Sequence, residues 1–249
     1  IGASRRISGS DKYACALSMA GLPYCWGDDS NNIVSNAPAS GTFGEIYSGN
    51  FQSCVLDSAG SPQCWGDLPT PGASVPPPPS GVAFEEIGIG MFHGCGLTTS
   101  QEIACWGITG GTPLTFDWGQ VNSAPTSSDF VSVASGDYHS CAVKDDGSLV
   151  CWGVDDQGWA DFGQVRDMPV TGDYVSVSAG RFNTCALTVS RTLVCWGDNS
   201  LGQSTPACLD DADCDGTLSA DDCDDSNALV WDDTDDLDCD GSLSADDCD

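Results

Sequence analysis

Short segments of alternating apolar and polar residues recur along the first two hundred residues of the chain. Phe130-Val131-Ser132-Val133 and Tyr174-Val175-Ser176-Val177 are two clear copies. After each such segment come a glycine, an aromatic or polar pair, and then a cysteine. Alternation with a period of two is typical of half-buried β-strands. The pattern therefore predicts an all-β fold built from many short strands.

The strand segments belong to five repeats, each of which ends in Cys-Trp-Gly. In every repeat a second cysteine lies ten residues before that motif, and these first cysteines are 39, 41, 46 and 44 residues apart. Strand units at such a period favour a β-propeller or propeller-like body over residues 1–206. Two arrangements stay open. In the first, residues 5–8 add a strand to the last repeat and so close a ring. In the second, the five units form an open curved stack.

The spacing of ten predicts a hairpin in each repeat. A hairpin centred on Asp146 pairs Val143 with Leu149 and Cys141 with Cys151. Opposed residues of a non-hydrogen-bonded pair have Cα atoms about 4.5 Å apart, at the short end of what a disulfide tolerates. Zinc sites use cysteines two to four residues apart and fit poorly. The expected disulfides are Cys15–Cys25, Cys54–Cys64, Cys95–Cys105, Cys141–Cys151 and Cys185–Cys195.

The hairpin loops are expected to have three residues, with glycine in the left-handed conformation at the third. Gly21, Gly60 and Gly147 occupy that position. The loops 99–101 and 189–191 contain no glycine. We therefore expect those two loops to adopt a different conformation.

Charge separates the C-terminal region, residues 207–249, from the repeats. The chain has 37 acidic and 7 basic residues and a formal net charge of −30. Seventeen of the acidic residues and none of the basic ones lie from Asp210 onward. So acidic a chain repels nucleic acid and anionic membranes, which excludes both as partners. No apolar run approaches the roughly 20 residues of a membrane span.

The acidic region contains one twelve-residue pattern twice, 25 residues apart. Oxygen ligands at positions 1, 3, 5 and 12 and a glycine at position 6 are typical of a calcium loop, and position 7 binds through its backbone carbonyl. Aspartate at position 12 favours an extracellular type of site, with a dissociation constant of about 10⁻⁴–10⁻³ M. A solvated acidic tail and another divalent ion are the alternatives. The candidate Ca²⁺ ligands are Asp211, Asp213, Asp215, Thr217, Asp222, Asp236, Asp238, Asp240, Ser242 and Asp247.

Cysteine usage indicates a secreted, extracellular protein, because 15 cysteines in one chain are typical of an oxidising compartment. No signal peptide is visible, so we expect a mature or trimmed product. Five cysteines lie outside the repeats, an odd number, so one is free, bonded to another chain, or paired beyond Asp249. Those five are Cys208, Cys214, Cys223, Cys239 and Cys248.

The repeats resemble a known family. Ser135-Gly136-x-Tyr138-His139-Ser140-Cys141, followed by Cys151-Trp152-Gly153 and a trailing Leu201-Gly202-Gln203, is similar to the regulator of chromosome condensation repeat. The resemblance covers roughly residues 5–205 and is closest to the secreted bacterial branch, which has Cys-Trp-Gly for Trp-Gly. It implies a β-propeller, commonly of seven blades, whereas this chain has five units. The acidic region resembles thrombospondin type 3 repeats, which implies calcium-binding loops linked by disulfides.

Few residues are candidates for a functional site within the repeats. His93 and His139 share a repeat position with Tyr13, Gln52 and Asn183, which indicates a structural role. Trp118 and Trp159 lie in the longest loops between hairpins, and packing and exposed contact both stay open for them. The proline run 76–79 is a spacer or a contact loop. No nucleophile–histidine arrangement and no phosphate-binding loop is recognisable.

These observations favour a secreted, non-enzymatic structural or adhesive module stabilised by calcium. Self-association into an extracellular fibre or matrix is a specific option, and a surface or matrix protein is the other expected partner. The alternative is a soluble binding protein or hydrolase inhibitor that acts through the propeller loops. An enzyme would need acid and base residues converging from adjacent units. Exposed aromatic side chains would favour binding, and a carboxylate pair in a cleft would favour catalysis.

Overall fold

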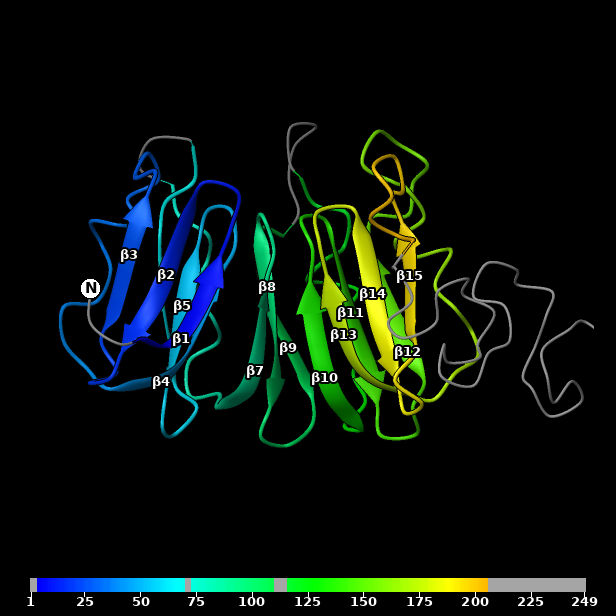
Figure 1. Cartoon of the computed structure of the whole chain (residues 1–249), viewed down its shortest axis with the longest axis horizontal. Helices are drawn as coiled ribbons and strands as arrows, with labels where there is room; N and C mark the ends of the chain where they lie inside the picture. The colour runs from blue at the N-terminus through cyan, green and yellow to red at the C-terminus, as the bar shows by residue number, and fades with distance from the viewer. Residues whose placement is uncertain (1–3, 70–72, 110–115, 206–249) are drawn as a thin grey trace, which may run out of the picture. The chain divides into compact units, whose positions relative to one another are not determined.

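The computed structural model describes residues 4–69, 73–109 and 116–205, and within these ranges every regular element is a β-strand (Figure 1). Residues 1–204, which contain all five repeats, form one compact unit, separate from the residues that follow. The strands are β1 (Ser4–Gly9), β2 (Tyr13–Ser18), β3 (Pro23–Gly27), β4 (Phe43–Ser48), β5 (Ser53–Asp57), β6 (Pro62–Trp65), β7 (Phe84–Ile89), β8 (His93–Thr98), β9 (Ile103–Gly107), β10 (Phe130–Ser135), β11 (His139–Lys144), β12 (Leu149–Gly153), β13 (Tyr174–Ala179), β14 (Asn183–Thr188) and β15 (Leu193–Gly197).

Each repeat supplies one complete blade. Three consecutive strands form an antiparallel sheet, so that β1–β3 make blade 1 and β13–β15 make blade 5. Residues 5–8 belong to β1, where Ser8 lies opposite Cys15 of β2. Closure of a ring by these residues, one of the two predicted arrangements, is therefore wrong. The strand before each hairpin pairs with that hairpin, as Ala134 does with Cys141 in blade 4.

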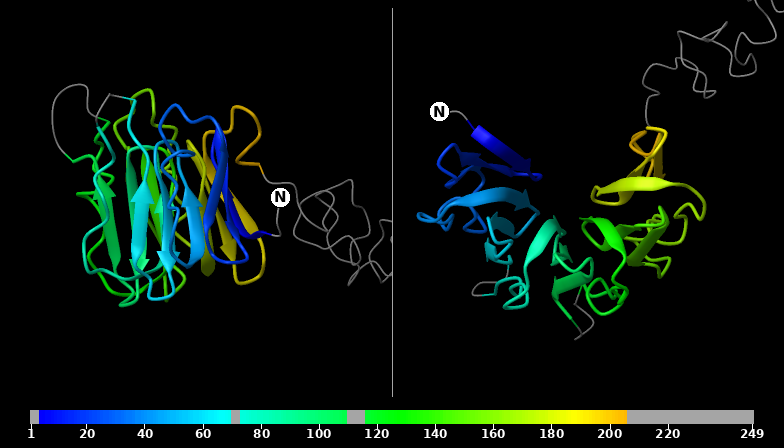
Figure 2. Two further views of the ribbon diagram at one scale, coloured as in Figure 1. Left: turned by 90° about the vertical axis from the view of Figure 1, so that its left-hand side faces the viewer. Right: turned by 90° about the horizontal axis from the view of Figure 1, so that it is seen from below.

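The five blades follow one another around an open arc, which Figure 2 shows from below. Blade 1 lies at one end of the arc and blade 5 at the other. The first strand of each blade faces the inside of the arc, because residues of β1, β4, β7, β10 and β13 line the same central hollow. The predicted all-β, propeller-like architecture is confirmed as an open curved array of five units.

The hairpins have the predicted register. Cys141 lies opposite Cys151 and Val143 opposite Leu149. All five predicted disulfides are present, and in each the two Cα atoms are 4.0 or 4.1 Å apart. A pair of adjacent strands already fixes this distance, so the spacing of ten residues is sufficient to predict the bond.

The hairpin loops are more uniform than their sequences suggest. Gly21, Gly60 and Gly147 have φ of 79°, 78° and 80°. Gln101 and Arg191 occupy the same position with φ of 62° and 70°. The expectation that these two loops differ is wrong. The register of the flanking strands imposes the left-handed residue even where its side chain makes that conformation unfavourable.

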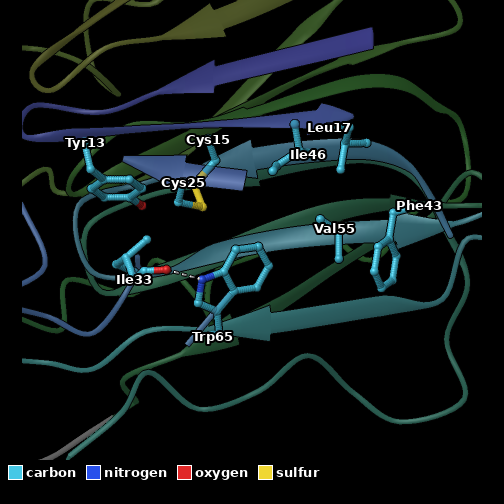
Figure 3. Packing of buried hydrophobic residues seen from close by; sticks show 9 residues of the cluster. All are labelled: Tyr13, Cys15, Leu17, Cys25, Ile33, Phe43, Ile46, Val55 and Trp65. Carbon is cyan, nitrogen blue, oxygen red and sulfur yellow. Dashed lines mark hydrogen bonds between the residues drawn. A yellow bond between two sulfur atoms is a disulfide. The ribbon is translucent and has the colours of Figure 1, made fainter. Parts of the chain in front are cut away.

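The tryptophan of Cys-Trp-Gly packs at the junction with the preceding blade. The indole Nε1 of Trp65 donates to the carbonyl of Ile33 at 2.8 Å, as Figure 3 shows. Trp152 and Trp196 donate in the same way to backbone carbonyls of the loop before their blade. Trp106 instead donates to the side chain of Gln52. These four indoles are 4–9% exposed, whereas Trp26 in blade 1 is 42% exposed.

A second link joins neighbouring blades near the axis. The residue two positions before the first cysteine reaches the next blade: His93 Nε2 lies 2.8 Å from Ser140 Oγ, and His139 Nε2 lies 2.6 Å from Thr184 Oγ1. Tyr13 does the same, with its hydroxyl 2.9 Å from Ser53 Oγ. Both histidines are fully buried. Their role is structural, as the repeat pattern indicates.

Glycines allow the blades to approach this closely. A Cβ atom placed on Gly49, Gly90 or Gly136 would collide with the backbone carbonyl oxygen of the corresponding glycine in the next blade. In the last blade, Gly180 would meet only its own Asn183. The requirement is therefore one of close backbone approach between blades.

Replacement of Gly136 by alanine is expected to open the junction between blades 4 and 5. The new methyl group meets backbone, which cannot move aside as a side chain would, so we expect the free energy of unfolding to fall by about 1–3 kcal/mol. Urea denaturation measures this change. Gly44→Ala is the matched control, because its Cβ would have nothing nearer than the Leu56 carbonyl at 4.0 Å. Equal stability of the two variants would contradict the close approach.

Candidate binding face

One edge of the blades collects the turns and loops that differ most between repeats. In a three-stranded antiparallel sheet the first strand ends where the second begins and where the third ends. The first turn of each blade therefore lies beside the loop that leads to the next blade, at the top of Figure 1. The longest of these loops connect β9 to β10 and β12 to β13.

Eight aromatic side chains form a continuous cluster along this edge, which we call the aromatic face. Four come from the first turns of blades 2–5, three residues before the first cysteine, and four come from the two long loops. They are Phe51, Phe92, Phe116, Trp118, Tyr138, Trp159, Phe162 and Phe182.

Tyr138 is the centre of the aromatic face. Its ring centroid lies 5.0 Å from that of Trp118 and 5.5 Å from that of Trp159, both edge-on, and 5.7 Å from that of Phe182. Edge-to-face contacts at these distances are favourable for aromatic rings. The cluster links blades 4 and 5 to the loop before each of them, so the surface is held by tertiary contacts.

Part of the aromatic face is open to solvent. Trp159 is 62% exposed, Phe162 42% and Phe116 38%. Trp118 is half-buried against Tyr138, so of the two loop tryptophans Trp159 presents the exposed contact surface. Pro76, Pro77 and Pro79 are exposed as well. Large exposed aromatic groups on a fixed surface are a frequent sign of an interaction site.

Two buried glutamines hold the loops that carry these rings. Gln120 accepts from the backbone N–H of Trp118 and donates to the carbonyl of Phe116. Gln164 repeats both bonds with Phe162 and Ala160. The signal that predicts them is the motif Asp-x-Gly-Gln, at 117–120 and 161–164. From the sequence, only the variant at 201–203 was noted as a motif; Trp118 was a candidate contact, whereas Phe162 was missed.

Acidic side chains border the exposed rings. The carboxylate of Asp156 accepts from Trp118 Nε1 at 2.9 Å. Arg166 is the local cation and contacts three carboxylates at 3.3–3.5 Å, those of Asp155, Asp161 and Asp167. The loop between β12 and β13 thus combines exposed aromatic surface with an excess of negative charge.

The turns that carry four residues of the aromatic face also border a cavity of about 260 Å³, which we call the axial cavity. Its wall consists of the ends of the first strands and the turns that follow them, with contributions from all five blades. Its three charged side chains and its one amide side chain lie four residues before the first cysteine of their blades. They are Asp11, Asn50, Asp137 and Arg181.

Asp137 is the most buried of these groups. Its carboxylate accepts from Asn50 Nδ2 at 3.1 and 3.3 Å and lies 3.3 Å from Arg181 Nε. Burial raises the pKa of Asp137 to about 6, although the guanidinium of Arg181 acts in the opposite direction; the charge of Asp11 adds to the rise. The carboxylate therefore joins blades 2, 4 and 5 and is ionised at neutral pH.

The structure contains both exposed aromatic side chains, which would favour binding, and two carboxylates in one cavity, which would favour catalysis. The exposed aromatic rings favour binding. Asp11 and Asp137 both line the axial cavity. The carboxylate of Asp137, however, is held in a structural role by a hydrogen bond from Asn50 and an ion pair with Arg181. Within the described residues no group of three His, Cys, Asp or Glu side chains is placed to hold a metal ion. The geometry therefore gives stronger support to binding.

The predicted calcium ligands all lie outside the described residues, as do the five cysteines from Cys208 onward. In the part of the chain that the structure describes, no helix is long and apolar enough to cross a membrane.

Comparison with protein families gives one match, to the regulator of chromosome condensation (RCC1) repeat, at residues 130–164 and 174–203. The matched residues lie in blades 4 and 5. The matched residues include the buried His139, which links blades 4 and 5, and the loop that carries Trp159. No curated protein matches the chain.

Solved structures with similar folds include two plant receptor ectodomains. The CRINKLY WD40 ectodomain of the Arabidopsis thaliana receptor kinase ACR4 is 25% identical, with a TM-score of 0.60, over 83% of this chain and 66% of that one. The ectodomain of the Physcomitrella patens receptor kinase CR4 is 29% identical, with a TM-score of 0.60, over 77% and 50%.

Prp20p from Saccharomyces cerevisiae has the same fold at 16% identity, with a TM-score of 0.61, over 80% of this chain and 58% of that one. The chain thus spans between half and two thirds of the length of these three structures. The similarity supports an RCC1-like, propeller-type repeat fold.

The buried histidines make a prediction about acid stability. Burial lowers the pKa of His93 to about 4 and of His139 to about 3, whereas an unfolded histidine has a pKa of about 6.5. Below pH 6.5 the unfolded chain binds protons that the folded chain does not, so stability falls with pH, by up to about 1.4 kcal/mol per pH unit for each histidine. Asp137, with its raised pKa, acts in the opposite direction between its unfolded value and about 6.

His139→Gln should reduce the slope of unfolding free energy against pH between pH 6 and 4 by about one proton. Glutamine occupies the same position in blade 2, as Gln52, so it is compatible with the junction. Urea denaturation at a series of pH values measures the slope. Asn183→Gln is the control, because it alters the same position of blade 5 without a titrating group. A wild-type slope for His139→Gln would mean that the folded protein protonates this histidine.

Proposed function

We propose that the chain is a secreted, non-enzymatic structural or adhesive module that binds a protein partner through the aromatic face. The observation that carries this proposal is the 62% exposure of Trp159 within a cluster whose other members are fixed by packing. A rigid aromatic anchor loses little conformational freedom on binding, which is why tryptophan and tyrosine dominate many interfaces.

An extracellular location is supported by two observations. The five blade disulfides are stable in an oxidising compartment. Two of the similar solved structures are receptor ectodomains. Prp20p is described by its binding to Gsp1p and histones, so that propeller binds proteins. These similarities make a protein the favoured class of partner here.

Self-association is the form of binding that fits a fibre or matrix. If a second copy covers the aromatic face, the particle mass measured by light scattering should exceed that of the monomer and fall to it in Trp159→Ser. Val189→Ser is the matched control, because Val189 is a 68% exposed apolar residue on the hairpin edge of blade 5. A monomer under all conditions would contradict self-association. It would favour the soluble binding protein or hydrolase inhibitor, which uses the same loops.

The acidic region adds calcium binding to this proposal. In each twelve-residue loop the carboxylates at positions 1, 3, 5 and 12 repel one another until a cation binds, so calcium should stabilise the region. Isothermal titration should find two Ca²⁺ ions per chain, and Asp213→Asn should remove one of them. Asp145→Asn, in the hairpin loop of blade 4, is the control for the loss of one charge. An unchanged stoichiometry in Asp213→Asn would exclude the first loop as a site.

Light scattering before and after chelation tests whether calcium joins subunits. Large particles that dissociate when calcium is removed support a calcium-dependent assembly. Particles of the same mass under both conditions limit calcium to stabilising its own loops.

A further inference from the structure

The axial cavity carries an excess of negative charge. Two carboxylates, those of Asp11 and Asp137, face one guanidinium, that of Arg181. Arg181 pairs with Asp137 through Nε at 3.3 Å. Asp11 is exposed, and among the described residues no cation pairs with it. A cation entering the cavity would therefore meet an uncompensated carboxylate at its rim.

Aromatic residues adjoin the wall of the cavity along the chain. Phe51, Tyr138 and Phe182 each directly follow a residue of the cavity wall, namely Asn50, Asp137 and Arg181. The protein already places a cation on one of these rings, since the guanidinium of Arg181 lies 4.8 Å from the centroid of Phe182. Rings beside carboxylates attract planar cations through both the ring quadrupole and the charge.

The dimensions suit a side chain. A volume of about 260 Å³ accommodates a guanidinium group together with several waters, each of which occupies about 30 Å³ in the liquid. A guanidinium presents five N–H donors in one plane, pairs with carboxylates in a fixed geometry and stacks on aromatic rings, whereas an ammonium is a strongly hydrated point charge. The cavity wall therefore matches arginine better than lysine.

We propose that the axial cavity binds the guanidinium of an arginine side chain, which a protein partner presents at the aromatic face. In this arrangement Asp11 is the primary carboxylate, Asp137 adds charge from within, and the ring of Tyr138, next to Asp137 in the chain, flanks the side chain. This inference rests on the proposed function, which supplies the protein partner. It adds the chemistry that the partner must offer.

The site should respond to pH. The charged and titratable groups around Asp137 are Asp11 from the turn after β1, Arg181 from the turn after β13 and the adjacent Tyr138. Blade 2 contributes the neutral Asn50, which donates to the Asp137 carboxylate, and blade 3 contributes Met91, whose backbone N–H donates to the Asp137 carbonyl. Because protonation of Asp137 would make the cavity less negative, binding of a cation should weaken as pH falls through about 6.

The probe is a capped peptide with one arginine between glycines, titrated into the full chain at pH 7.5. The control peptides replace arginine by citrulline, which keeps the shape and removes the charge, or by lysine. Chemical shifts of the Asn50 side-chain amide and the Arg181 Nε–H report on the cavity. We expect saturable shifts with the arginine peptide, weaker binding of the lysine peptide, and none with citrulline.

Asp11→Asn should weaken binding of the arginine peptide about fivefold to thirtyfold, the loss expected for one charge-assisted contact. Asp145→Asn removes the same charge from the hairpin edge of blade 4 and should leave binding within about twofold of wild type. Binding at pH 5 should be weaker than at pH 7.5 in the wild-type chain. The difference between the two pH values is measured as peptide affinity, which is a separate quantity from the free energy of unfolding.

Three outcomes would overturn the inference: equal binding of the arginine and citrulline peptides, no shift at high-millimolar arginine peptide, or equal effects of Asp11→Asn and Asp145→Asn. The proposed function fails separately. If Trp159→Ser leaves particle mass unchanged while the arginine peptide binds, the cavity stands and self-association through the aromatic face falls. If Trp159→Ser abolishes association and the peptide does not bind, the aromatic face stands and the arginine site falls.

Discussion

The close junction between successive blades is the constraint on which the body of this protein depends. In a repeat array each unit can bury its apolar face only against its neighbours, so each blade needs a neighbour. Three contacts make the junction: a tryptophan that donates to the preceding blade, a side chain that reaches the next blade near the axis, and a glycine whose missing side chain admits the next backbone. In blade 4 these are Trp152, His139 and Gly136.

The same junction positions the aromatic face. His139 and Gly136 flank Asp137 and Tyr138, so the residues that fix the blades are interleaved with those that face the cavity and the surface. Trp152 donates to the carbonyl of Gln120, and the side chain of Gln120 holds the loop that carries Trp118. Stability of the array and placement of the exposed rings therefore share one set of contacts. Variants at the surface can change binding only as far as these contacts remain intact.

Much of the fold could be predicted because repetition and strand geometry are local properties. The spacing of Cys141 and Cys151 defines a hairpin register without knowledge of the rest of the protein. The prediction that residues 5–8 close a ring was wrong because it assigned them a distant partner. They form a strand that pairs with the hairpin of their own blade. The prediction that the loops of Gln101 and Arg191 differ from the others was wrong for a related reason. It gave more weight to residue preference than to the strand register, which overrides that preference.

The candidate site was harder to predict because its members converge only through the curvature of the arc. Trp159 and Tyr138 were visible in the sequence, but their contact depends on how a long loop returns over the edge of blade 4. One feature of the repeats still carries information about the site. Most aligned positions near the axis hold similar residues, whereas the position four before the first cysteine holds Asp11, Asn50, Met91, Asp137 and Arg181. The junction does not require one chemistry at this position, and four of these residues line the axial cavity. Variation within a repeat that is otherwise constrained by packing thus points to the surface where a partner can be recognised.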